Sequence, residues 1–265
     1  NFLDGLKQGY GQFRWANGDV YEGQWIGDEM IGRGVVKYSD GTVYTGHCKN
    51  NKKHGHGEIE WATGDSYTGG WKDGLMHGEG VFHVKDGGRY EGQWAEGKRQ
   101  GHGIMKFGNG DMYEGQWLNH LRHGTGTSTF ADGSVYVGEY ERDQRQGYGE
   151  LTRSKETGMG PATEYSYIGA WQEDTMHGPG KEILRDGEKY DGDWVNGKRS
   201  GFGTCCYGNG DVYRGHWAMG KKDGWGRLVW ADGNSYEGQF SNDLVAPGRK
   251  GQKPQNTPTE TLVSM

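Results

Sequence analysis

The sequence predicts an all-β fold: an elongated solenoid of consecutive antiparallel β-hairpins that form one twisted sheet with an aromatic groove. Two motifs, Tyr-x-Gly and Gly-x-Gly, recur with a period of about 23 residues, and turn dipeptides separate them. One interval, from Tyr136 to Tyr167, is longer by eight positions and breaks the period. The Tyr-x-Gly motif begins at Tyr21, Tyr44, Tyr67, Tyr90, Tyr113, Tyr136, Tyr167, Tyr190, Tyr213 and Tyr236.

The composition indicates an ordered chain with few aliphatic side chains. Of 265 residues, 53 are Gly and 31% are hydrophobic, values that alone would suggest disorder. The 11 Trp and 16 Tyr argue for an ordered structure built from rings. The net charge of −6 argues against a nucleic-acid partner. Three cysteines make no disulfide framework, and neither a signal peptide nor a membrane-spanning apolar stretch is visible, so we expect a cytoplasmic protein.

Each repeat has the alternation of a β-hairpin. In Tyr21–Trp25, the Tyr, Gly and Trp fall on one face while Glu and Gln fall on the other. The second strand, Gly9–Trp15, likewise places Gly, Phe and Trp on one face. Glycines within strands mark close approach, so we expect rings from neighbouring hairpins to lie across their backbone.

Turn residues close the hairpins at both ends. Asn-Gly or Asp-Gly follows the second strand, as at Asn17-Gly18, and predicts a tight turn with positive φ at both central residues. At the other end, the column of Asp28 and Asn51 again holds residues that tolerate positive φ. Two strands per repeat predict an advance of about 10 Å per repeat.

The hallmark Tyr-x-Gly-x-Trp followed by Gly-x-Gly resembles the MORN repeat family, over residues 1 to about 240. The sequence departs from this pattern where Cys48, Tyr140 and Phe240 replace the Trp. The resemblance implies a single-sheet solenoid with an aromatic-lined groove. Members of the family include ciliary radial-spoke components, cytoskeletal scaffolds of protists, membrane-junction proteins and accessory modules of lipid kinases and a histone methyltransferase.

The repeat phase also predicts the domain limits. We expect a MORN-repeat solenoid over 1–240 and a polar, flexible tail over 241–265, which holds three of the five prolines. Counting back one period from Trp25 reaches Phe2, so we expect earlier repeats upstream. The eight extra residues lie within 150–166, where we expect a longer loop whose glycines and Pro161 break the ladder. This loop is either a tolerated insertion or a landmark for a partner.

The repeat accounts for the motifs that suggest chemistry. Three GxxxxGK segments lack both the Ser or Thr that would bind magnesium and the helix that a phosphate-binding loop requires. A column of histidines places its members about 10 Å apart, too far for one metal. Cys205 and Cys206 lie on one predicted strand and point to opposite faces. We therefore expect no catalytic residue, no cofactor and no metal. The histidines are His54, His77, His123 and His177.

The ring columns form the predicted partner groove, which we expect to be both core and binding surface. Narrow grooves rich in Trp and Tyr suit an amphipathic helix or an extended segment of another protein. Self-association is a further partner class. The predicted groove residues are Tyr21, Trp25, Tyr67, Trp71, Tyr90, Trp94, Tyr113, Trp117, Tyr167, Trp171, Tyr190, Trp194, Tyr213 and Trp217.

Charged residues predict two edges. Aspartates at the Asn-Gly turns give an acidic edge, which turn chemistry and solubility explain. No turn rule demands the cations at the other end, so their edge is a candidate contact for an acidic partner or an anionic membrane. The basic edge comprises Lys52, Lys53, Lys98, Arg99, Arg122, Arg145, Lys198, Arg199, Lys221 and Lys222.

Three functions are compatible with these features. The leading hypothesis is a non-enzymatic, protein-binding scaffold of the cytoskeleton, in the ciliary or flagellar axoneme as the family resemblance implies. The first alternative is a membrane tether that binds anionic phospholipids through the basic edge. The second is an accessory module of an enzyme whose catalytic domain lies outside this sequence.

Overall fold

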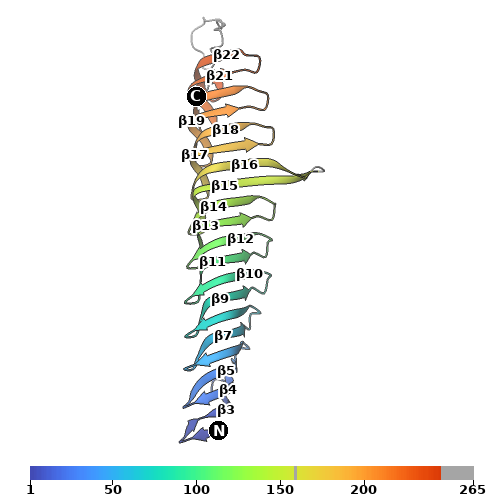
Figure 1. Cartoon of the computed structure of the whole chain (residues 1–265). Helices are drawn as coiled ribbons and strands as arrows, with labels where there is room; N and C mark the ends of the chain where they lie inside the picture. Colours follow the sequence, from blue (N-terminus) through green and yellow to red (C-terminus); the bar gives the residue numbers. More distant parts are fainter. Residues whose placement is uncertain (158–159, 246–265) are drawn as a thin grey trace, which may run out of the picture. The chain divides into compact units, whose positions relative to one another are not determined.

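The computed structural model describes residues 1–157 and 160–245, and all regular structure in these residues is β (Figure 1). The chain divides into two compact units, Asn1–Gln144 and Arg145–Met265. Within each unit, consecutive strands pair antiparallel, and the sheet is not closed into a barrel. The predicted solenoid of antiparallel hairpins is confirmed.

The first unit begins with a two-stranded sheet, β1 paired with β2, and continues with a ladder from β3 to β14. Its strands are β1 (Phe2–Leu3), β2 (Leu6–Lys7), β3 (Gly9–Arg14), β4 (Val20–Ile26), β5 (Glu29–Lys37), β6 (Val43–Lys49), β7 (Lys52–Glu60), β8 (Ser66–Lys72), β9 (Leu75–His83), β10 (Arg89–Ala95), β11 (Lys98–Lys106), β12 (Met112–Leu118), β13 (Leu121–Thr129) and β14 (Val135–Glu141).

The second unit holds a ladder that ends at β23, beyond the predicted limit of 240. The remaining tail, from 246 onward, lies outside the described residues. The strands are β15 (Gln144–Thr157), β16 (Gly160–Gln172), β17 (Thr175–Leu184), β18 (Lys189–Val195), β19 (Lys198–Cys206), β20 (Val212–Ala218), β21 (Lys221–Val229), β22 (Ser235–Ser241) and β23 (Leu244–Val245).

The two kinds of turn are distributed differently from the prediction. At the Asn-Gly turn, the Gly18 N–H donates to the Trp15 carbonyl at 3.0 Å, and Trp15 N–H donates to the Asp19 carbonyl at 2.9 Å. Only Gly18 there has a positive φ, so this is a three-residue loop with a glycine bulge rather than a type I′ turn. Type I′ geometry occurs at the opposite end, where Asn50 and Asn51 have φ of 50° and 63°. The extra loop residue removes the need for a positive φ at Asn17.

The insertion lengthens a hairpin instead of forming a loop. Figure 1 shows β15 and β16 reaching beyond β17 and β18 of the same unit, and their ladder continues to the pair Thr157 and Gly160. One register shift, between Arg153 and Ser154, accommodates the change. The expected break at Gly160 and Pro161 is therefore wrong. Extending both strands pairs inserted backbone groups with each other, which a loop would leave to water.

The core lies on the face that carries Tyr21 and Trp25, called the inner face below. Tyr90 illustrates the packing: its ring lies over the backbone of Gly92 and Gly103, which face each other on β10 and β11. A Cβ atom at Gly103 would overlap the Tyr90 hydroxyl. The glycines thus admit a ring from a directly paired strand, where the sequence had suggested a neighbouring hairpin.

Candidate partner-binding groove

The predicted groove rings form the core of each unit. All fourteen side chains are between 0% and 6% exposed, so they present almost no surface to a partner. Tyr90 and Trp94 pack edge to face at 5.2 Å between centroids, and Tyr90 meets Trp117 of the next repeat in the same way at 5.4 Å. Their predicted role as core is confirmed. Their predicted contact with a partner stays a prediction, limited by this burial to the small surfaces that Tyr90, Trp94 and Trp117 present to two hollows described below.

Hydrogen bonds hold these buried rings in place. The Trp117 indole N–H donates to the Gly103 carbonyl at 3.1 Å, and the Tyr113 hydroxyl donates to the Gln116 carbonyl at 2.9 Å. Burial raises the pKa of Tyr90 to about 12, so its phenol stays neutral at physiological pH. These buried ring groups are therefore neutral and hydrogen-bonded.

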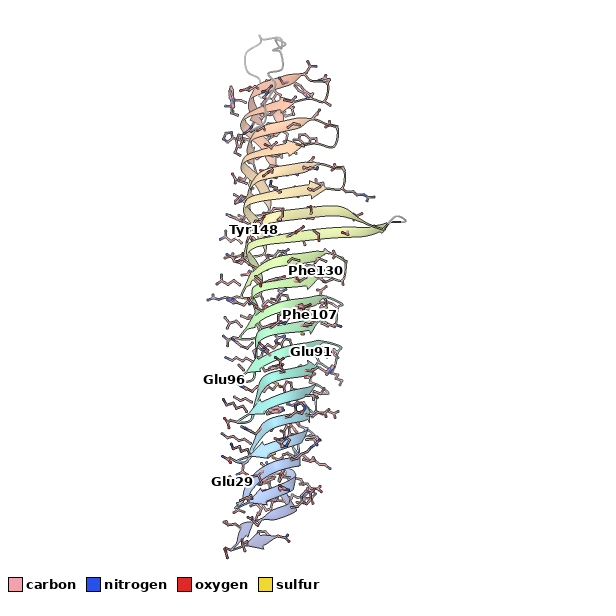
Figure 2. All side chains as sticks on the ribbon, viewed as in Figure 1. Glu29, Glu91, Glu96, Phe107, Phe130 and Tyr148 are labelled. Atoms are coloured by element: carbon pink, nitrogen blue, oxygen red, sulfur yellow. The ribbon has the colours of Figure 1, made fainter. Side chains whose placement is uncertain are left out.

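A second row of side chains supplies the accessible wall of the inner face. Phe82 and Trp61 pack with their centroids 5.5 Å apart, and Phe107 is 36% exposed. Figure 2 shows Phe107 and Phe130 on one side of the first unit, while Glu29 and Glu96 lie at the opposite strand ends. The accessible groove surface thus comes mainly from the columns of Phe13 and Trp15, and the Tyr-x-Gly-x-Trp motif contributes little to it.

The basic edge divides into two sets because consecutive strand residues point to opposite faces. The first set is exposed, and the second turns inward, where each cation lies between 4.2 and 5.2 Å from the centroid of an aromatic ring. The prediction of a single outward edge is therefore wrong for the second set. The exposed set is Lys52, Lys98, Lys198 and Lys221. The inward set is Lys53, Arg99, Arg122, Arg145, Arg199 and Lys222.

Several inward cations also meet a carboxylate from the next repeat. Arg122 contacts Asp143 at 3.3 Å, and Arg145 contacts Asp174 at 3.0 Å. Arg199 differs, because it lies 2.6 Å from Glu182, a carboxylate that replaces an apolar residue of the core column. These pairs neutralise the cations locally, so they are structural rather than available to a partner.

Within the described residues of the first unit, two inward cations form no ion pair with such a carboxylate. Lys53 donates to the Tyr38 hydroxyl at 3.3 Å, and Arg99 has no acidic residue in the corresponding column. The Arg99 guanidinium stacks on Trp117, 4.5 Å from the ring centroid, and donates to the His120 carbonyl at 3.0 Å. Across residues 1–157 and 160–245, no carboxylate lies within 4.0 Å of it, because His120 occupies the column that holds Asp143 one repeat later. Burial and the neighbouring Arg99 and Lys98 lower the pKa of His120, which is therefore neutral at physiological pH. Arg99 therefore forms no direct ion pair in the described residues, and the carboxylate that acts on its charge is the more distant Asp143.

Two hollows flank Arg99 on the inner face. The smaller, of about 320 Å³, is lined mainly by apolar side chains that include Met76, Phe82, Val84 and Met105. The larger, of about 550 Å³, is more polar. Both are bordered by Arg99 and His120. The larger hollow is lined by Phe107, Asn109, Asp111, Met112, Trp117, Arg122, Ser128, Phe130 and Asp143, among others.

Sequence reasoning missed the unpaired state of Arg99. The signal was present in the spacing, since Arg122 and its partner Asp143 are 21 residues apart. The same step from Arg99 reaches His120. The sequence alone does not show that residues 21 positions apart are in contact, so the replacement of aspartate by His120 could not be interpreted without the structure.

The aspartates of the acidic edge form hydrogen bonds at the turns, in agreement with the interpretation that turn chemistry explains them. The Asp65 carboxylate accepts a hydrogen bond from Lys85 N–H at 2.9 Å, and Asp111 accepts one from Ala131 N–H at 2.8 Å. These carboxylates join successive turns, and no partner is needed to explain them.

The remaining candidates are arranged as follows. Cys205 is buried and Cys206 exposed, so the prediction of opposite faces is confirmed. In the part of the chain that the structure describes, no three His, Cys, Asp or Glu side chains lie close enough together to hold a metal. The same residues include no helix with the length and apolar character needed to cross a membrane.

Solved structures with some likeness to this chain include CPAP domains. The TCP10 domain of Danio rerio CPAP is 12% identical with a TM-score of 0.40, over 86% of this chain and 99% of that chain. The same domain in complex with a peptide of Danio rerio STIL is 11% identical with a TM-score of 0.42, over 86% of this chain and 98% of that chain. A third structure is the SAS-4 (dCPAP) TCP domain of Drosophila melanogaster in complex with a Proline Rich Motif of Ana2 (dSTIL). It is 12% identical with a TM-score of 0.32, over 78% of this chain and 90% of that chain. Likeness at these TM-scores says nothing about the partners of this chain. No curated protein matches it.

The family comparison agrees with the repeat geometry. The MORN repeat matches residues 1–20, 21–43, 44–66, 67–89, 90–112, 113–135, 136–157, 167–189, 190–212, 213–235 and 236–244. These stretches span nearly the whole described chain, and repeats of this kind indicate a scaffold that binds proteins or membranes. The sequence period, the paired hairpins and the family match together assign the chain to the MORN-repeat family.

Proposed function

We propose that this protein is a non-enzymatic scaffold that holds a segment of a partner protein against the inner face of its first unit. The observation that carries the proposal is Arg99, a cation without a carboxylate within 4.0 Å in the described residues, placed between two hollows. Partly buried charges are costly unless they are paired. A partner carboxylate would supply the missing pair.

The hollows define the chemistry of that segment. The hollow of about 320 Å³ between Phe82 and Met105 suits one large apolar side chain. An acidic residue next to it would reach Arg99, and polar groups would fill the larger hollow. An extended segment or one face of an amphipathic helix provides this order of side chains.

The proposed setting is the cytoskeleton, in the ciliary or flagellar axoneme and hence in the cytoplasm. Family membership supports this setting, because MORN-repeat proteins include radial-spoke components and cytoskeletal scaffolds. The membrane-tether alternative rests on Lys52 and Lys98 in the first unit and Lys198 and Lys221 in the second, which are exposed. Each exposed lysine near an anionic surface contributes about 1 kcal/mol to the free energy of membrane binding.

Detergent extraction of ciliated cells separates the two functions. The tagged full chain is expected to remain with the detergent-insoluble axoneme, because a membrane tether would dissolve with the lipid. Two variants address the groove: Arg99→Glu reverses the unpaired charge, and Val84→Trp fills the smaller hollow from its exposed rim. Lys98→Glu, next to Arg99 but exposed, is the matched control.

Loss of axonemal retention in Arg99→Glu and Val84→Trp, with Lys98→Glu unchanged, supports the proposal. Circular dichroism of the purified variants checks that they remain folded. Equal retention of all three folded variants would refute the groove. Retention that disappears with detergent, together with lysine-dependent sedimentation on phosphatidylserine vesicles, would establish the membrane alternative.

A further inference from the structure

The outer face of the second unit carries an aromatic and cationic patch that the inner groove does not explain. Trp225 is 53% exposed and Phe202 is 47% exposed, both at the middle position of Gly-x-Gly, on the face opposite the ring core. The position of Arg214 is filled by glutamate in four other repeats. Those glutamates are Glu22, Glu91, Glu114 and Glu237.

The two exposed rings stand on either side of His216. Phe202 faces His216 across β19 and β20, with 5.7 Å between ring centroids and an angle of 82°. The His216 ring nitrogen Nδ1 lies 3.0 Å from the Trp225 carbonyl oxygen on β21. A hollow of about 480 Å³ opens between these side chains, and the paired glycines Gly215 and Gly226 are part of its lining. Its lining is mixed: the rings and Val212 and Val229 are apolar, and Glu237 adds a carboxylate.

Two arginines complete the patch. Arg214 and Arg227 are direct cross-strand neighbours on β20 and β21, and both line the hollow. Like charges directly opposite each other destabilise a sheet. Arg214 lies over the Phe202 ring at 5.7 Å. Over the described ranges 1–157 and 160–245, neither guanidinium has a carboxylate within 4.0 Å. Cross-strand Glu237 and the Phe202 ring offset part of this repulsion, and the remaining positive charge is a reason to look for a ligand.

We propose that this outer patch binds an acidic peptide segment of a partner protein, separately from the inner groove. One carboxylate of the segment lies between Arg214 and Arg227, where it accepts hydrogen bonds from both guanidinium groups. An adjacent apolar side chain fills the space between Phe202 and Trp225. The segment runs along the hollow, past the backbone of Gly215 and Gly226.

The charge pattern favours a short acidic segment over an anionic membrane. The row across the sheet runs Asp191, Thr204, Arg214, Arg227 and Glu237, so Glu237 borders Arg227 directly and Asp191 lies two strands from Arg214. A flat anionic surface would meet these carboxylates as well as the arginines. A single carboxylate aimed between the arginines avoids them.

The test measures binding of a fluorescein-labelled decapeptide of alternating Glu and Leu to the full chain by fluorescence anisotropy. Arg214→Glu is the central variant, because the repeats themselves carry Glu at this position and the fold tolerates it. Trp225→Ala removes one exposed ring. Arg33→Glu, on the outer face of the first unit, is the matched control.

The native chain and Arg33→Glu are expected to bind the peptide with the same affinity, and Arg214→Glu and Trp225→Ala at least tenfold more weakly. A peptide of alternating Gln and Leu is expected to bind at least tenfold more weakly to the native chain. Equal affinity of native chain and Arg214→Glu, or no binding to the native chain, would overturn the proposal. Arg214-dependent sedimentation on phosphatidylserine vesicles without peptide binding would overturn it in favour of a membrane. The peptide also carries the acidic and apolar side chains proposed for the inner groove, so Arg99→Glu is measured alongside. A tenfold loss in that variant, with Arg214→Glu unchanged, would assign the peptide to the inner groove and overturn the outer patch.

Discussion

Replacing Trp117 by alanine tests the physical account of the core most directly. Trp117 is 4% exposed and meets two rings edge to face, Tyr113 at 5.2 Å and Tyr90 at 5.4 Å. Its indole N–H donates to the Gly103 carbonyl at 3.1 Å, and Arg99 stacks on its other surface at 4.5 Å. The substitution removes all of these contacts at once.

The expected loss in free energy of unfolding is about 3–5 kcal/mol, the range for truncating a buried large ring. Of this, the hydrogen bond contributes about 1 kcal/mol. Each edge-to-face ring pair adds about 0.5–1.5 kcal/mol beyond its buried area. Trp117→Phe keeps most of the apolar volume but leaves the Gly103 carbonyl without its donor, so its loss is expected to be about 1–3 kcal/mol.

Urea denaturation followed by circular dichroism measures these losses. Because the stability of a repeat protein is a sum of local terms, hydrogen exchange adds the location of the effect. Exchange is expected to accelerate in β10 to β13 and to stay unchanged in β4 to β6. The matched control is Trp225→Ala, since that side chain is 53% exposed and its loss is expected to be below about 0.5 kcal/mol. Equal losses for the two tryptophans would refute the assignment of the inner face as the core.

Three further predictions concern the same packing. Gly103→Ala places a methyl group against Tyr90 and is expected to cost about 1–3 kcal/mol in urea denaturation; Gly11→Ala is the control, because the nearest atom there is 4.0 Å away. Arg199→Glu leaves Glu182 without its cation, and the free energy of unfolding is expected to fall by about 3–5 kcal/mol. Lys198 is exposed on the same strand, so Lys198→Glu is expected to change the free energy of unfolding by less than about 0.5 kcal/mol. Stability is expected to fall from pH 10 to pH 12, because burial raises the pKa of Tyr90 to about 12 while an unfolded tyrosine ionises near 10.

Each of these predictions has a contradicting outcome. Equal stability of the two alanine variants would show that the tyrosine rings do not require glycine beneath them. A Lys198→Glu loss as large as that of Arg199→Glu would contradict the division of the basic residues into exposed and inward sets. In the alkaline titration, the unfolded chain releases protons that the folded chain retains, so unfolding is favoured as the pH rises. Because Tyr10 and Tyr148 are exposed, the size of the absorbance rise at 295 nm is decisive: a rise near pH 10 that accounts for all 16 tyrosines, without loss of circular dichroism, would contradict the burial of the rings.

Much of the fold was predictable because its determinants are local. The alternation in Tyr21–Trp25 and the constant repeat period place every strand of the regular repeats. The turn types were harder, since Asn17-Gly18 is compatible with both a two-residue turn and a three-residue loop. The insertion was misjudged because strand pairing at its ends, seen between Thr157 and Gly160, outweighs local turn preference.

The candidate sites also differ in whether local sequence determines them. The outer position of Trp225 follows from alternation alone, because neighbouring residues of a strand point to opposite faces. The state of Arg99 does not, because its environment depends on His120, a residue of the next repeat. The same holds for Arg199, whose partner Glu182 comes from the repeat before.

The sequence by itself therefore determined the repeat, the strands and the face on which each side chain lies, since these depend on neighbours within a few residues. The tertiary structure decided which of these side chains remain available. It buried the Tyr and Trp columns beneath a second row of rings and cations, paired Arg122 with Asp143, and left Arg99 unpaired. The physical reason is that burial and charge compensation are properties of contacts between adjacent repeats, and those contacts form only when the hairpins stack.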